Sequence, residues 1–150
     1  MKSFEQWMSE YGESHQNPTN QIIHKLCVPV IMFSTLGYLW LIPRPELFSF
    51  SPFMNWASIF SIGALIFYAT LNIKYMLVMA VECAFMLWLI HYFEINLAMN
   101  QLYFYTILFL ISWVVQIIGH KIEGKKPSFM QDLSFLLIGP LWVLKALGVK

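Results

Sequence analysis

Four long apolar stretches constrain the fold of this chain more than any other feature. Between them they carry a single formal charge, Glu82, and they cover residues 28–42, 53–71, 75–93 and 97–118. A helix needs about 20 apolar residues to cross a hydrocarbon core about 30 Å thick, and the last three stretches match this length. We therefore expect an all-α, polytopic membrane protein with about four transmembrane helices and a short C-terminal re-entrant or interfacial helix.

The composition supports a membrane protein. Hydrophobic residues make up 59% of the chain and charged residues only 11%, whereas soluble proteins average about 25% charged residues. The net charge of +1 comes without a basic stripe that could engage phosphates, which argues against a nucleic-acid partner. Cys27 and Cys83 lie in or beside apolar segments without CxxC spacing, so we expect packing residues rather than a disulfide framework.

The chain reads as one membrane-embedded domain, 1–150, with four parts. They are a polar, amphipathic segment 1–17, helical spans 18–118, a polar motif segment 119–132 and a short apolar helix 133–150. The first segment carries apolar side chains at spacings of three and four, namely Phe4, Trp7, Met8 and Tyr11. This spacing predicts a helix whose apolar face lies on the membrane surface.

Proline, glycine and asparagine mark the expected helix boundaries. Asn17 followed by Pro18 is typical of a helix start, and Pro29 is expected to bend that helix. Short turns are predicted at 72–74 and 93–96. Gly124 and Pro127 should end any helix that continues past the fourth span.

The last apolar piece, 133–147, is too short for a certain crossing. Gly139 and Pro140 are expected to interrupt it. We therefore predict a re-entrant or surface-lying segment there.

The lysines indicate an orientation. With four crossings, one side of the membrane receives only Arg44 in its loops, whereas the other receives Lys2, Lys25, Lys74, Lys121, Lys125 and Lys126. The positive-inside rule then places the lysine-rich side in the cytoplasm. The same side would hold His15, His24, His120 and Glu123.

Two polar motifs, far apart in sequence, lie at ends of the apolar helices. Each presents three groups on one helix face, at i, i+3 and i+7 in Asn17, Asn20 and His24, and at i, i+4 and i+7 in Gln116, His120 and Glu123. With His15, these motifs offer three imidazoles and one carboxylate to a metal. A His/carboxylate set with open positions suits Fe(II) and O2 chemistry, but Zn(II) binds the same ligands, and spacing leaves both open.

Two further polar residues stand apart from these motifs. The topology places His91 near the opposite membrane face, where we interpret it as an interfacial residue. Glu82 lies in the middle of a span, where a carboxylate is a functional candidate by default. A protonated, hydrogen-bonded structural role is slightly favoured for it over substrate gating.

Two other classes of function remain open on the residues alone. A membrane scaffold or interaction protein would use the polar motifs as structural caps and bind no metal. A small transporter would use Glu82 as an intramembrane relay. The first predicts tolerance of His-to-Asn changes, and the second predicts Glu82-dependent flux in liposomes.

The two motifs together resemble the Mpo-type family of 2-hydroxy fatty acid dioxygenases. The residues that carry the resemblance are His15-x-Asn17-Pro18-x-Asn20-x3-His24 with Pro29, and Gly119-His120-x2-Glu123-Gly124-Lys125-Lys126-Pro127. The similarity covers nearly the whole chain. It departs from the family pattern where Cys27-Val28-Pro29 replaces Gly-Ile-Pro and where Ser128, in place of Ala, follows Pro127.

The resemblance implies an Fe(II)-dependent enzyme of fatty acid α-oxidation. A 2-hydroxy long-chain fatty acid would lose its carboxyl carbon with consumption of O2, leaving an acid one carbon shorter. The implied metal ligands and catalytic residues are His15, His24, His120 and Glu123. Side chains expected to orient these ligands are Asn17, Asn20 and Gln116, and the lysines expected to attract the substrate carboxylate are Lys121, Lys125 and Lys126.

The expected partners are therefore a 2-hydroxy fatty acid, O2 and the lipid bilayer. The short chain is typical of a bacterial inner-membrane protein with its site on the cytoplasmic face, whereas a eukaryotic relative would reside in the endoplasmic reticulum. The sequence sets neither the oligomeric state nor the preferred chain length.

Overall fold

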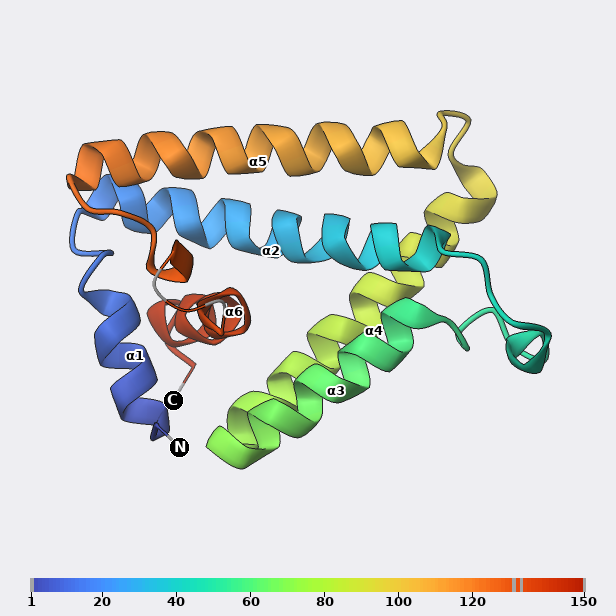
Figure 1. Ribbon diagram of the computed structural model, residues 1–150, viewed down its shortest axis with the longest axis horizontal. Coiled ribbons are helices and arrows are strands. Elements are labelled where there is room, and N and C mark those ends of the chain that lie inside the picture. The colour runs from blue at the N-terminus through green and yellow to red at the C-terminus, as the bar shows by residue number, and fades with distance from the viewer. Residues whose placement is uncertain (1, 131, 133, 150) are drawn as a thin grey trace. The chain divides into compact units, whose positions relative to one another are not determined.

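The computed structural model describes residues 2–130, 132 and 134–149, and every regular element in this part of the chain is helical (Figure 1). The elements are α1 (Phe4–Gly12), α2 (Pro18–Leu41), η1 (Glu46–Phe48), α3 (Trp56–Leu71), α4 (Ile73–Asn96), α5 (Gln101–Glu123), η2 (Ser128–Met130) and α6 (Phe135–Ala146). The predicted all-α class is confirmed. Among these helices, α2, α4 and α5 are long and apolar enough to cross a membrane.

The structure does not confirm the expected count of about four spans. The predicted second span corresponds to α3, which has 16 residues and is therefore about 24 Å long at 1.5 Å per residue. This length falls short of a hydrocarbon core of about 30 Å. Three helices of the described chain thus reach spanning length, and α3 and α6 are shorter apolar helices.

The chain divides into two compact units. A terminal unit combines Met1–Ile31 with Leu110–Lys150, and a central unit consists of Met32–Phe109. The first part of α2 and the last part of α5 belong to the terminal unit, together with α1, η2 and α6. The sequence predicts one membrane-embedded domain, whereas the packing separates these two units within it.

The central unit contains an antiparallel pair of helices, α3 and α4, joined at Asn72 (Figure 1). The Asn72 side chain accepts hydrogen bonds from the backbone N–H groups of Lys74 and Tyr75 at 2.9 and 3.3 Å, so this residue caps α4 while it ends α3. The turn predicted at 72–74 is confirmed. The turn predicted at 93–96 lies later, because α4 continues to Asn96.

A hydrophobic core holds the central unit together. Its buried members are Phe33, Leu36, Trp40, Ala57, Met86, Ile90 and Tyr105. Within this unit α2 and α5 are also joined by a polar contact, since the Tyr38 hydroxyl donates to Thr106 Oγ1 at 3.0 Å.

In the terminal unit, α1 packs against α6. The Trp7 ring meets Phe135 edge-on at 5.1 Å between centroids, and Tyr11 lies 5.5 Å from Trp142. The apolar face of α1, predicted to lie on the membrane surface, is instead buried in this packing. Periodicity identified the buried face, but the face had two possible apolar partners, the bilayer and α6.

The helix α6 is continuous where an interruption was expected. It passes through Gly139 and Pro140, and its neighbours Ile138 and Leu141 are fully buried. A proline inside a helix costs about 3 kcal/mol, whereas each fully buried aliphatic side chain contributes roughly 1.5–3 kcal/mol, so packing outweighs the proline. The predicted start of this piece, Leu133, lies outside the described residues.

The end of α5 follows the prediction from Gly124. This glycine has φ of 74°, a left-handed conformation that ends helices and that side-chain-bearing residues rarely adopt. Its N–H donates to the carbonyl of His120 at 3.0 Å. As a result His120 and Glu123 both lie in the last turn of α5, at the point where the chain turns away.

Candidate metal centre

His15 lies in the short connection between α1 and α2. Its backbone N–H donates to the carbonyl of Gly12 at 3.0 Å, which folds the chain back after α1. The next helix starts as the sequence predicts, because Asn17 Oδ1 accepts from the N–H of Thr19 at 2.9 Å and Pro18 is the first residue of α2. Pro29 lies inside α2, as expected.

Three histidines from three parts of the chain meet in the terminal unit. The ring centroids of His15 and His24 are 4.2 Å apart, and His120 lies 5.1 Å from His15 and 4.9 Å from His24. One ring nitrogen of each falls within 4.8 Å of those of the others. The exposed fractions are only 1%, 2% and 6%, respectively. The convergence expected from the two motifs is thus present for all three imidazoles.

Backbone carbonyls orient two of these rings. His15 Nδ1 lies 2.6 Å from the carbonyl of Tyr11, and His24 Nδ1 lies 3.0 Å from the carbonyl of Asn20. A carbonyl only accepts, so each Nδ1 carries the hydrogen and each Nε2 keeps its lone pair. This pattern is typical of histidine ligands whose other nitrogen is held by a backbone group.

Two ring nitrogens of the cluster are buried without a hydrogen-bond partner in the described part of the chain. They are His15 Nε2 and His120 Nδ1. Buried polar atoms are nearly always paired, and an unpaired one costs about 1–3 kcal/mol. A metal ion that accepted both lone pairs would supply the partner that the two atoms lack.

Burial also sets the protonation state of His15. Removal of its ring from water lowers the pKa of His15 to about 4, an effect that the hydrogen bond to the Tyr11 carbonyl opposes only in part. The ring is therefore neutral at pH 7. Neutral imidazole is the form that coordinates metals.

Glu123 lies beside the cluster but outside the group of converging ligand atoms. Its carboxylate accepts hydrogen bonds from the backbone N–H groups of Gln16 and Asn17, both at 2.8 Å, and from Asn20 Nδ2 at 3.2 Å. The carboxylate thus connects the end of α5 to the loop that carries His15. The role of Glu123 as a fourth metal ligand stays a prediction; in this structure its carboxylate is hydrogen-bonded to the loop that carries His15.

The three side chains predicted to orient the ligands have different surroundings. Asn20 is fully buried, donates to the Ser14 carbonyl at 3.1 Å and to Glu123, and supplies the carbonyl that holds His24. Asn17 caps α2 and donates its N–H to Glu123. Gln116 is buried on α5 one turn before His120.

Several residues around His15 escaped the reasoning from sequence. The Tyr11 ring stacks on His15 at 4.2 Å with an interplanar angle of 5°, and Trp142 of α6 lies 5.1 Å away on a tilted plane. Ser14 Oγ lies 3.2 Å from His15 Nδ1 and 2.6 Å from Ser128 Oγ. Ser128 was noted as a departure from the family pattern, but its contact with Ser14 was not foreseen; Trp142 gave no signal beyond its apolar character.

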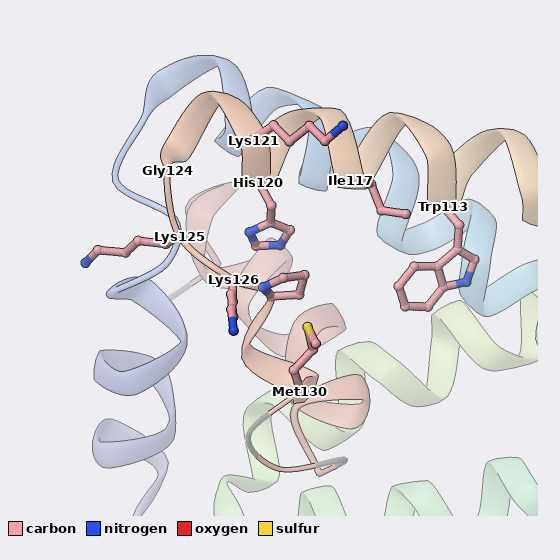
Figure 2. A pocket seen from close by; sticks show the side chains of 9 residues that line it. Trp113, Ile117, His120, Lys121, Gly124, Lys125, Lys126 and Met130 are labelled. Atoms are coloured by element: carbon pink, nitrogen blue, oxygen red, sulfur yellow. The ribbon is translucent and has the colours of Figure 1, made fainter.

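The three lysines predicted to attract a carboxylate are exposed, and one is engaged elsewhere. Lys125 Nζ donates to the backbone carbonyl of Glu13 at 2.6 Å, and its side chain extends away from His120 (Figure 2). Lys121 and Lys126 are exposed at an open cleft of about 450 Å³. The cleft is lined by Trp113, Ile117, His120, Lys121, Gly124, Lys125, Lys126, Pro127 and Met130.

The two other polar residues named from sequence belong to the central unit. His91 Nδ1 lies 3.0 Å from the Glu94 carboxylate. Glu82 lies on α4. Neither residue belongs to the group of converging histidines in the terminal unit.

Comparison with known proteins bears on the whole chain. The family model described as 2-hydroxy-palmitic acid dioxygenase Mpo1-like matches residues 1–150. No curated protein and no solved structure matched the chain. The family match covers both histidine motifs and the helices between them, and the chain belongs to the Mpo1-like family of 2-hydroxy-palmitic acid dioxygenase-like proteins.

Proposed function

We propose that this protein is an iron-dependent dioxygenase that shortens 2-hydroxy long-chain fatty acids by one carbon. The observation that carries the proposal is the convergence of three buried imidazoles, His15, His24 and His120, in a chain of this family. A membrane protein with its site at the end of the apolar helices α2 and α5 also suits an amphipathic substrate.

The three histidines fit a metal ion. Two of their buried nitrogens have no hydrogen-bond partner among the residues that the structure describes, and two of the rings present Nε2 lone pairs because backbone carbonyls occupy Nδ1. Three nitrogen ligands leave coordination positions for substrate and O2, which suits Fe(II). Zn(II) accepts the same ligands, but the family's dioxygenase name favours a redox-active metal.

The overall reaction balances with one O2. A 2-hydroxy acid and O2 give an acid one carbon shorter, CO2 and water. Fe(II), when bound, would supply the electrons that activate O2. The chain itself would hold the metal, keep water from it with the rings of Tyr11 and Trp142, and bring the substrate carboxylate near through Lys121 and Lys126.

Glu123 would act through the loop it holds. Its carboxylate fixes the N–H groups of Gln16 and Asn17, which flank His15 in sequence, so it would set the position of that ligand relative to α5. Asn20 would help to position two residues of the site, because its side chain donates to Glu123 and its backbone carbonyl orients His24. Gln116 would support His120 from the preceding turn of α5.

The same proposal includes a location. The lysines near the site, together with Lys2 and Lys25, favour the cytoplasmic face under the positive-inside rule. The host membrane would be the bacterial inner membrane, or the endoplasmic reticulum in a eukaryote.

Metal analysis combined with oxygen consumption tests the function. Detergent-purified protein reconstituted anaerobically with Fe(II) should hold one iron per chain. It should also consume O2 only when a 2-hydroxy fatty acid is added, with the acid one carbon shorter as product. Iron binding without oxygen consumption would refute a 2-hydroxy fatty acid as the substrate. Protein that binds no metal would favour the alternative of a membrane scaffold protein.

A further inference from the structure

We infer that the cleft beside His120 binds the part of the acyl chain nearest the substrate's head group and leaves the distal chain in the bilayer. This inference rests on the proposed function, because it takes the 2-hydroxy fatty acid as the occupant. It adds a specificity rule: the enzyme distinguishes substrates by the structure of the chain close to the head group and tolerates changes further along.

The cleft follows one face of α5. Trp113, Ile117 and His120 are spaced i, i+4 and i+7, so they lie along about 10 Å of that face. Pro127 and Met130 line the cleft as well, from the segment that follows α5, as Figure 2 shows for Met130. The direction from His120 to Trp113 leads from the polar end of α5 into its apolar stretch.

The charges at the cleft select the occupant. His120 belongs both to the cleft and to the histidine cluster, so a ligand in the cleft reaches the proposed metal position with one end. Lys121 and Lys126 also line the cleft and are exposed, so they add positive charge to it, whereas Lys125 is hydrogen-bonded to the Glu13 carbonyl. A single-chain amphiphile with an anionic head at His120 and methylene groups beside Trp113 and Ile117 matches this arrangement.

The cleft is open along its side, which limits how much of the substrate's acyl chain it can contact. Ile117 is 48% exposed and Met130 is 64% exposed, so lipid can reach the cleft laterally. Each methylene that passes from water into apolar surroundings contributes about fourfold to binding. For a chain end already in lipid this gain is the same in the free and bound states, so lengthening there should change affinity less than about twofold.

Photo-crosslinking of the protein loaded with Fe(II) under anaerobic conditions tests the placement, and oxidation of the acid is measured separately after O2 is admitted. Two 2-hydroxy fatty acids carry a diazirine, one close to the head group and one at the chain end, and labelled residues are mapped by mass spectrometry in lipid nanodiscs. The proximal probe should label the 113–130 region, and an excess of unlabelled 2-hydroxy acid should abolish that labelling. The distal probe should label many lipid-facing residues without competition.

A pair of tryptophan substitutions provides the matched control. Ile117→Trp fills the cleft and should reduce competed labelling by the proximal probe about tenfold or more. Val114→Trp introduces the same bulk on α5 at a 57% exposed position that does not line the cleft, and should leave labelling unchanged. Both variants should retain the parent's metal content, measured separately on protein loaded with Fe(II).

A second variant keeps the test decisive if Ile117→Trp does not fold. Trp113→Ala enlarges the cleft at the end away from His120, so a competitor with a methyl branch on the carbons that reach Trp113 should gain affinity relative to the straight acid. No relative gain would overturn the specificity rule.

Three outcomes separate this inference from the proposed function. Competition by phospholipid equal to that by the 2-hydroxy acid would make the cleft a general lipid contact and overturn the inference. If the acid is oxidised but the proximal probe labels residues outside 113–130, the cleft is not the binding site for the chain, and the proposed function still stands. Saturable labelling in the cleft without any oxidation would retain the binding site and refute the reaction.

Discussion

The histidine rings and the atoms that hold them determine what this protein can bind. His15 and His24 each direct Nδ1 to a carbonyl of the chain, and both His15 Nε2 and His120 Nδ1 are buried without a partner among the described residues. A metal ion would satisfy both unpaired atoms at once. Loss of any one ring would remove one of the three proposed nitrogen ligands and open a cavity beside the other two rings.

Replacement of His24 or His120 by alanine should abolish stoichiometric metal binding. The reason is that two imidazoles hold a divalent ion far more weakly than three. The measurement is iron per chain by elemental analysis after anaerobic loading. His91→Ala, in the central unit, is the matched control and should keep the parent's metal content. Full iron content in both site variants would show that these rings are not ligands.

Glu123→Gln should weaken metal binding without removing a ligand. The amide keeps one acceptor oxygen, so one of the N–H groups of Gln16 and Asn17 would face an NH2 group instead of a carboxylate. Loss of groups that orient ligands typically costs 10–100-fold in metal affinity. Competition with a chelator of known affinity measures this loss, and Glu46→Gln, in the exposed η1 turn, serves as control. Complete loss of metal, as in the histidine variants, would instead support Glu123 as a fourth ligand.

At the level of helices, the site depends on a close approach between α2 and α5 in the terminal unit. A Cβ at Gly119 would collide with Asn20 Oδ1 and would also lie 3.3 Å from two carbons of Ile23. Glycine at this position therefore lets Asn20 reach Glu123 and brings His24 toward His120. A larger residue would have to separate the two helices.

Gly119→Ala should destabilise the protein and lower its metal affinity. Overpacking of this kind costs about 1–3 kcal/mol, which exceeds the gain of up to about 1 kcal/mol from better helix propensity. Gly63→Ala is the matched control, because Gly63 lies inside α3 with nothing within 4 Å of an added Cβ. Thermal unfolding in detergent should give a lower Tm for the first variant and an equal or higher Tm for the second. Equal Tm shifts would mean that the helices separate without cost.

The sequence predicted the helices better than their packing. Apolar length located α2, α4 and α5, and Pro18 and Gly124 marked two helix ends, because these signals are local. The partner of α1 was missed because an apolar face fits a bilayer and a neighbouring helix equally well. The continuity of α6 through Pro140 was missed because burial, which offsets the proline, is a property of the whole unit.

The candidate site shows the same division. The sequence correctly predicted that His15, His24 and His120 converge, because each lies beside a predicted helix end. Spacing did not reveal that the Glu123 carboxylate is used by backbone N–H groups, because those groups belong to a loop more than a hundred positions earlier in the chain. Trp142 lies on an element that carried no polar motif and was therefore missed.

On the scale of the whole molecule, the proposed metal site lies in only one of the two compact units. The histidine cluster belongs entirely to the terminal unit, whereas the central unit is built on its own hydrophobic core. A ligand of the cluster should therefore stabilise one unit directly and the other little.

Metal binding should protect the terminal unit selectively from hydrogen exchange. At a metal concentration 100 times the Kd, binding stabilises the folded state by about 2.7 kcal/mol. Exchange measured by mass spectrometry, with and without Fe(II) under anaerobic conditions, should slow for peptides from 2–31 and 110–149. Peptides from 32–109 should change little. Equal protection throughout the chain would indicate a single cooperative unit and contradict the division.

The histidines of the cluster come from opposite ends of the polypeptide, with His15 and His24 near its start and His120 near its end, and this has a consequence for biosynthesis. A nascent chain that has inserted only through α4 presents His15 and His24 but not His120, because α5 follows later. Such a chain holds two of three imidazoles and, on the proposed function, would retain iron only weakly. Iron would then load only after the last long helix has left the ribosome, so a truncated product would stay empty instead of releasing partly reduced oxygen into the membrane.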